Sequence, residues 1–104
     1  MNKKRIRAKF RQEVFDRDGY QCRKCGFKSS PAKAENEIDA HHIINRNNLP
    51  FGGYIRENGI TLCRKCHLEA EQGNLGFDEQ TLFACVKSSR EEAIEADLAL
   101  GKIV

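Results

Sequence analysis

Two Cys-x-x-Cys pairs constrain this chain more than any other feature of its sequence. The pairs are Cys22/Cys25 and Cys63/Cys66, and they account for four of the five cysteines in 104 residues. No apolar signal-peptide core follows the basic start, so we expect a cytoplasmic protein whose thiols are reduced. Pairs of this spacing in a reducing compartment predict structural Zn²⁺ held by four thiolates, with free or redox-active cysteines as the alternative.

The segment between the two pairs is unusually long. It holds 37 residues, against about 12–20 in common zinc-finger patterns, and is therefore an inserted unit. Its centre, residues 37–44, has strand-forming neighbours around the tandem pair His41 and His42. Adjacent side chains on a strand point to opposite faces. One imidazole can therefore bind a metal while the other faces a substrate.

The N-terminal region predicts a basic amphipathic helix. Ile6, Phe10 and Val14 recur at helical spacing over about residues 6–16. Six basic residues and no acidic ones lie within 3–11, and we expect the first part of this run to be a flexible arm. Phosphate contact is one interpretation of the run, and a solvated surface is the other.

The remaining elements follow from turn and capping signals. We expect a surface loop over 28–37, a strand over 60–62 and a helix over 67–72. Two more helices are expected, over 78–87 with Asp78 as its cap and over 90–100 with a capping box of Ser89 and Glu92. Cys85 lies in an apolar setting and is expected to be a small buried hydrophobe. The last helix carries an apolar stripe for packing against the domain or a partner, formed by Ala93, Ile94, Leu98 and Leu100.

Charge is distributed unevenly along the chain. Residues 1–67 hold 15 Lys and Arg against 7 Asp and Glu, a net charge of +8, whereas residues 68–104 hold 3 against 8, a net charge of −5. This asymmetry indicates a face that meets a polyanion. No segment approaches the roughly 18 apolar residues that span a bilayer, so no membrane partner is expected. The candidate nucleic-acid-binding residues are Lys3, Lys4, Arg5, Arg7, Arg11, Arg46 and Arg56.

Taken together, these residues resemble the HNH endonuclease family, in which a ββα-metal site is inserted between two zinc-binding cysteine pairs. The resemblance covers about residues 10–72 and rests on Cys22-x-x-Cys25, Asp39-Ala40-His41-His42-Ile43, Gly52-Gly53, Asn58 and Cys63-x-x-Cys66-His67. It implies a small α+β fold, a zinc-stapled ββα-metal (His-Me finger) domain with flanking N- and C-terminal helices. The single domain 1–104 would comprise a basic helix or arm (1–19), the zinc knuckles and metal core (20–72), and a helical extension (73–104).

The resemblance also implies a role for each site residue. His42 would be the general base, and Asn58 would orient the base or its loop. His41 and His67 would bind one divalent cation. Colicin-type members use His-x-x-x-His on the helix where this chain has His67-x-x-x-Glu71, so Glu71 is the third-ligand candidate. Two alternatives stay open: His67 as a ligand of the structural zinc, and Asn58 as a turn residue.

The predicted function is metal-dependent DNA endonuclease activity, by a one-metal mechanism with a histidine base. A monomer would nick, and a homodimer could cut both strands. Mg²⁺ or Mn²⁺ is the first expectation for the catalytic cation, with Zn²⁺ or Ni²⁺ as alternatives. A phage origin, with the packaging terminase or another packaging protein as partner, is implied by resemblance alone. The rival functions are a non-catalytic zinc-ribbon module that binds nucleic acid and an adaptor whose acidic C-terminal helices dock a partner.

Overall fold

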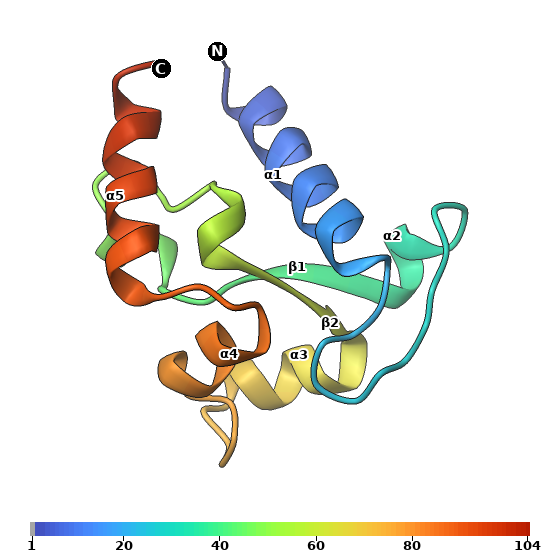
Figure 1. Ribbon diagram of the computed structural model, residues 1–104. Helices are drawn as coiled ribbons and strands as arrows, with labels where there is room; N and C mark the ends of the chain where they lie inside the picture. The colour runs from blue at the N-terminus through green and yellow to red at the C-terminus, as the bar shows by residue number, and fades with distance from the viewer. Residues whose placement is uncertain (1) are drawn as a thin grey trace.

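A two-stranded antiparallel sheet lies at the centre of the fold, with helices packed on it (Figure 1). The computed structural model describes residues 2–104. The elements, in chain order, are α1 (Lys3–Asp18), α2 (Ala34–Glu37), β1 (Ile38–His42), η1 (Arg46–Asn48), η2 (Arg56–Asn58), β2 (Gly59–Cys63), α3 (Arg64–Glu71), α4 (Glu79–Cys85) and α5 (Arg90–Gly101). No helix in this range is both long and apolar enough to cross a membrane.

The register of the sheet separates the two histidines. Ile38 pairs with Cys63 at one end and His42 pairs with Gly59 at the other. The His42 ring stacks on Phe10 of α1, with ring centres 4.5 Å apart, whereas His41 meets His67 of α3 at 5.2 Å. Helices α1 and α3 therefore cover opposite faces of the sheet, and the tandem pair presents one imidazole to each.

Gly59 permits the close packing of α1 on the sheet. A Cβ at this position would lie 2.3 Å from Cγ2 of Val14 and 2.8 Å from the ring of Phe10. Any side chain here would push α1 away from the strand. The absence of one lets Phe10 reach the ring of His42.

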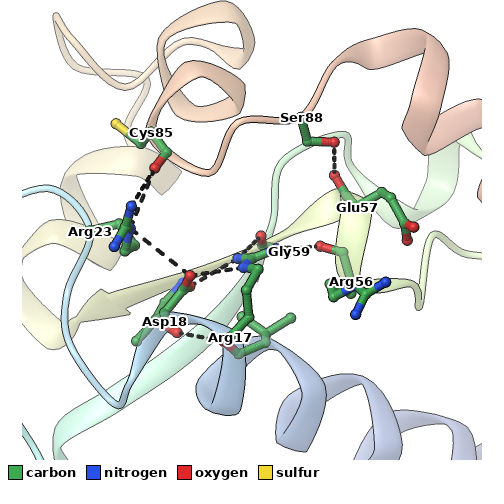
Figure 2. Close-up of polar contacts among 10 residues, drawn as sticks. Arg17, Asp18, Arg23, Arg56, Glu57, Gly59, Cys85 and Ser88 are labelled. Atoms are coloured by element: carbon green, nitrogen blue, oxygen red, sulfur yellow. Dashed lines mark hydrogen bonds and ion pairs between the residues drawn. The ribbon is translucent and has the colours of Figure 1, made fainter.

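The end of α1 is joined to β2 by a buried carboxylate (Figure 2). Asp18 accepts hydrogen bonds from Arg17 Nε at 2.8 Å and from the amide of Thr61 at 3.0 Å. The Arg17 guanidinium also donates to the carbonyls of Arg56 and Gly59, each at 2.7 Å. This network fixes the helix to the start of β2, next to the site.

The N-terminal predictions need two corrections. Helix α1 begins at Lys3, so the expected flexible arm is already helical, because the Asn2 side chain accepts a hydrogen bond from the Arg5 amide at 2.9 Å and caps the first turn. The expected loop over 28–37 contains the short helix α2, whose Ala34 packs in a small core with Phe15 and Ile38.

The capping predictions for the last two helices are confirmed. The side chain of Asp78 caps α4, and that of Ser89 caps α5 by accepting from the Glu92 amide at 3.1 Å. Cys85 is half-buried rather than buried, because it lies at the end of α4, where its carbonyl accepts from Arg23 (Figure 2). Within the predicted apolar stripe of α5, Ala93 is buried, whereas Leu98 is 47% exposed and does not pack against the domain.

Helix α5 buries Asp97 as well as Ala93, and both side chains are fully buried. The Asp97 carboxylate accepts hydrogen bonds from the amides of Phe51 at 3.0 Å and Gly53 at 2.8 Å. Both amides belong to the segment that connects β1 to β2, which lies between α1 and α5 in Figure 1. The C-terminal helix thereby holds the loop that joins the two strands of the site.

Candidate zinc site and candidate active site

The four paired cysteines meet at one point. Their sulfur atoms all lie within 4.8 Å of one another, and those of Cys25 and Cys63 are 3.6 Å apart. Tetrahedral zinc with Zn–S bonds of about 2.3 Å requires sulfur atoms about 3.8 Å apart. The amide of Cys25 points at the sulfur of Cys22 at 3.5 Å, and that of Cys66 at the sulfur of Cys63 at 3.4 Å. The cluster therefore suits a structural zinc ion.

The protonation of Cys22 agrees with this assignment. Burial raises the pKa of its thiol, but hydrogen bonds from neighbouring backbone amides, that of Cys25 foremost, outweigh burial and lower the pKa to about 7. One of the four thiolates is thus accessible near neutral pH, whereas burial and the neighbouring thiols raise the pKa of Cys66.

His67 faces two carboxylates rather than the cysteine cluster. Its Nδ1 lies 3.1 Å from Oδ2 of Asp39, and its Nε2 lies 3.1 Å from Oε1 of Glu71. The alternative in which His67 ligates the structural zinc is therefore not what the structure shows. Asp39 belongs to the same sequence motif as His41, but the motif alone assigns it no role. Its position two residues before His41 on a strand is the signal that places both on one face.

The surroundings of His67 fit a cation. If Nδ1 carries the proton and donates to Asp39, Nε2 presents a lone pair to the Glu71 carboxylate. A cation or a second proton between these two atoms removes that repulsion. Two ligand atoms on neighbouring corners of an octahedron with bonds of about 2.1 Å are about 3.0 Å apart, close to the observed separation. A carboxylate behind a histidine ligand, as Asp39 stands behind His67, is the usual support of a metal site.

His41, on β1, lies beside His67, with ring centres 5.2 Å apart. Burial, reinforced by the charge of His67, lowers the pKa of His41 to about 4, although Glu71 and Asp39 oppose the shift. A neutral imidazole at pH 7 has the form that binds metals. Across residues 2–104, only the cysteines bring three or more such ligand atoms within 4.8 Å of one another. The ligand atoms of His41, His67 and Glu71 are therefore not gathered around one point as the four sulfur atoms are.

His42 occupies the other face in an aromatic environment. Besides stacking on Phe10, its ring meets Tyr54 edge-on at 4.7 Å, and its Nε2 is buried with no hydrogen-bond partner. Burial, followed by the charges of His41 and Arg46, lowers the pKa of His42 to about 4. The ring also lines the same cavity of about 630 Å³ as His41, His67 and Glu71. The neutral imidazole is the form that accepts a proton, but a pKa of about 4 makes it a weaker base than an unperturbed histidine.

Asn58 is fully buried and acts on the backbone. Its side chain accepts from the amide of Ile44 at 2.8 Å and donates to the carbonyls of Ile44 at 3.0 Å and Gly53 at 3.3 Å. These bonds hold the chain that leaves His42 and the loop that follows it. The geometry agrees with an orienting role, and Asn58 is more than a residue of a surface turn.

The basic candidates divide into two groups. Arg46 lines the cavity that contains the histidines, and it also lines a second cavity of about 700 Å³ together with Lys3 and Arg7. The others line neither cavity, and they are Lys4, Arg5, Arg11 and Arg56.

A family model described as HNH endonuclease matches residues 22–73, half of the chain. The match begins at Cys22 and extends past Glu71, so it contains both cysteine pairs, the tandem histidines, Asn58 and His67. Comparison with curated proteins gave no match, and comparison with solved structures gave none. Helices α1, α4 and α5 lie outside the matched range.

Proposed function

The chain belongs to the HNH endonuclease family, and on that premise we propose that it is a metal-dependent endonuclease that hydrolyses phosphodiester bonds in DNA. The observation that carries the proposal is the division of the tandem histidines between two faces of β1. His41 lies beside His67 near Glu71, while His42 lies apart from them on the wall of the same cavity. A ligand group and a separate base next to one cavity are what a one-metal hydrolysis requires.

The metal would be held by His41, His67 and Glu71. A divalent cation there would neutralise charge on the scissile phosphate and on the departing oxygen. Asp39 would fix the tautomer of His67 by accepting its Nδ1 proton, which leaves Nε2 free to bind.

His42 would act as the general base. Being neutral at pH 7, its imidazole can take a proton from an attacking water in the cavity that it lines. Asn58 would serve as a positioning residue, because it holds the backbone on both sides of the loop that follows His42. Helix α3 begins at Arg64 with its N-terminus near the site, which adds positive potential toward a bound phosphate.

Cleavage of supercoiled plasmid with Mg²⁺ or Mn²⁺ tests the proposal. Wild type should convert the plasmid to open-circle or linear DNA, and His42→Ala should lose at least about a hundredfold in rate, the scale of general-base catalysis. His42→Ala must first be shown to retain zinc and to unfold cooperatively, because His42 also packs on Phe10. Lys33→Ala, on the exposed loop before α2, is the control that should cleave normally.

Two outcomes would overturn parts of the proposal. Equal rates for wild type and His42→Ala would reject His42 as the base. No cleavage by a zinc-loaded wild type that still binds DNA would favour the non-catalytic zinc module.

A further inference from the structure

A second groove continues from the candidate active site. Its volume is about 700 Å³, and it runs between the first turns of α1, the loop that connects the strands, and the end of α5. Arg46 and Asn47 line both this groove and the histidine cavity. The two cavities are therefore neighbours that share these two residues.

Three basic side chains and no acidic side chain line the groove, and Val104, the last residue of the printed sequence, lines it too. Lys3, Arg7 and Arg46 line it, no Asp or Glu does, and among the ion pairs of residues 2–104 none involves these three cations. In contrast, Arg17, Arg64 and Arg90 elsewhere are paired with carboxylates. Three unpaired cations around one hollow are suited to a phosphate.

Tyr54 adds a hydroxyl to these cations. Its phenol oxygen accepts from Arg46 Nη1 at 3.2 Å, and the Arg7 guanidinium lies 6.0 Å from the ring centre. Burial alone would raise the pKa of Tyr54, but hydrogen bonds and charge from Arg46 and Arg7 lower it. Because the oxygen accepts from arginine, its own proton is left to donate to an anion.

The other wall of the groove is apolar. Ile6, Leu49, Pro50 and Leu100 line it, together with Phe51, whose side chain is 42% exposed. One part of the Phe51 ring packs on Gly101 of α5, and the rest is open. A duplex would bring phosphates to the cations but has no free base face for this wall. An unpaired nucleotide brings both, since its base can stack on an aromatic ring.

We propose that this groove binds single-stranded DNA next to the cleavage site, with a phosphate on Arg7, Arg46 and Tyr54 and a base against Phe51. This inference rests on the proposed function, because it assigns the groove to the strand that is cut. It implies that the substrate is unpaired beside the scissile phosphate, as in an overhang, a flap or a gap.

Equilibrium binding tests the proposal without turnover. Zinc-loaded protein of residues 1–104, with no catalytic cation added, is titrated into a labelled ten-nucleotide oligo-dT and into a blunt-ended, GC-rich duplex of ten base pairs. Phe51→Leu keeps an apolar side chain but loses the stacking ring, and Phe27→Leu is its control, because Phe27 is equally exposed at 42% but does not line the groove. Arg7→Gln is compared with Arg5→Gln, which removes the same charge on the opposite side of α1.

Wild type should bind the single strand more tightly than the duplex. Phe51→Leu should weaken single-strand binding about five- to tenfold, as expected for lost stacking on one base, and change duplex binding less than about twofold. Arg7→Gln should weaken single-strand binding more than Arg5→Gln and reduce the salt slope by about 0.7. Phe27→Leu should behave as wild type.

Equal or tighter binding of the duplex, with Phe51→Leu indistinguishable from Phe27→Leu, would overturn the inference. Plasmid cleavage by the same wild-type preparation separates the two failures. Cleavage without single-strand preference would reject the groove and keep the nuclease. Single-strand preference that depends on Phe51 and Arg7, without cleavage under any metal, would reject the nuclease and keep the groove as a binding site.

Discussion

Asp97 offers a direct test of how the C-terminal helix supports the site. It lies on α5, outside the family match, and its fully buried carboxylate accepts from the amides of Phe51 and Gly53. The carbonyl of Gly53 accepts in turn from the side chain of Asn58 at 3.3 Å. Removing the carboxylate should therefore loosen the loop that Asn58 connects to β1.

The size of the effect follows from the two amides. Asp97→Ala leaves both without their acceptor, and an unpaired buried polar group costs about 1–3 kcal/mol. The Gly53 amide is buried, whereas that of Phe51 is only partly so. We therefore expect Asp97→Ala to lower the free energy of unfolding by about 3 kcal/mol. Asp97→Asn should lose less, because its amide oxygen can still accept from one of the two N–H groups.

Urea unfolding of zinc-loaded protein measures this difference. Glu95→Ala is the matched control, because Glu95 is an exposed acid on the same helix and should change stability by less than about 0.5 kcal/mol. If Asp97→Ala lost no more stability than Glu95→Ala, the two hydrogen bonds would not hold the loop. The reasoning that α5 is part of the site's support would then be refuted.

Three further predictions concern the cysteine cluster, the proposed cation site and the sheet. A zinc chelator should unfold the protein reversibly, as followed by circular dichroism, because zinc binding of about 10–16 kcal/mol is comparable to the stability of a whole domain. Asp39→Asn should weaken Mn²⁺ binding about 10–100-fold in calorimetry, because His67 loses the acceptor that fixes its tautomer. Gly59→Ala should cost about 1–3 kcal/mol in urea unfolding, because the added Cβ would lie 2.3 Å from Val14.

Each of these has its own control. Zinc added back should restore the circular dichroism signal, and a fold that survives chelation would contradict the cysteine assignment. Unchanged Mn²⁺ affinity in Asp39→Asn would mean that the carboxylate does not act on His67. The cost of Gly59→Ala should shrink when Val14→Ala is also present, and strict additivity of the two would exclude their steric contact.

Local patterns in the sequence were enough to predict the cysteine cluster, the strand with the tandem histidines and two helix caps. The cysteine pairs, the strand with His41 and His42, and the caps Asp78 and Ser89 depend on neighbours close in the chain, so spacing reveals them. The helical start at Lys3 could not be predicted from hydrophobic spacing, because Lys3 and its neighbours lack an apolar period. The first turn is instead capped by Asn2 through a single hydrogen bond.

The acids with structural roles could not be predicted in this way. Asp97 binds amides 44 and 46 residues away, and Asp39 meets His67 across 28 residues. Asp18 similarly reaches the amide of Thr61. In the sequence each is one acid among 15, and only the fold shows which partners satisfy it. On α5 the side chain of Asp97 is therefore buried, and its apolar neighbour Leu98 is exposed.

Cys63 links the cysteine cluster to the helix that carries His67. It is the last residue of β2 and the N-cap of α3, and its sulfur accepts the Cys66 amide as well as facing the other cysteines. His67 follows only four residues later, on the first turns of that helix. The cysteine cluster therefore fixes the start of α3, the helix that carries His67. Any ion that altered the spacing of the four sulfur atoms would move the start of α3, and with it the position of His67 relative to His41.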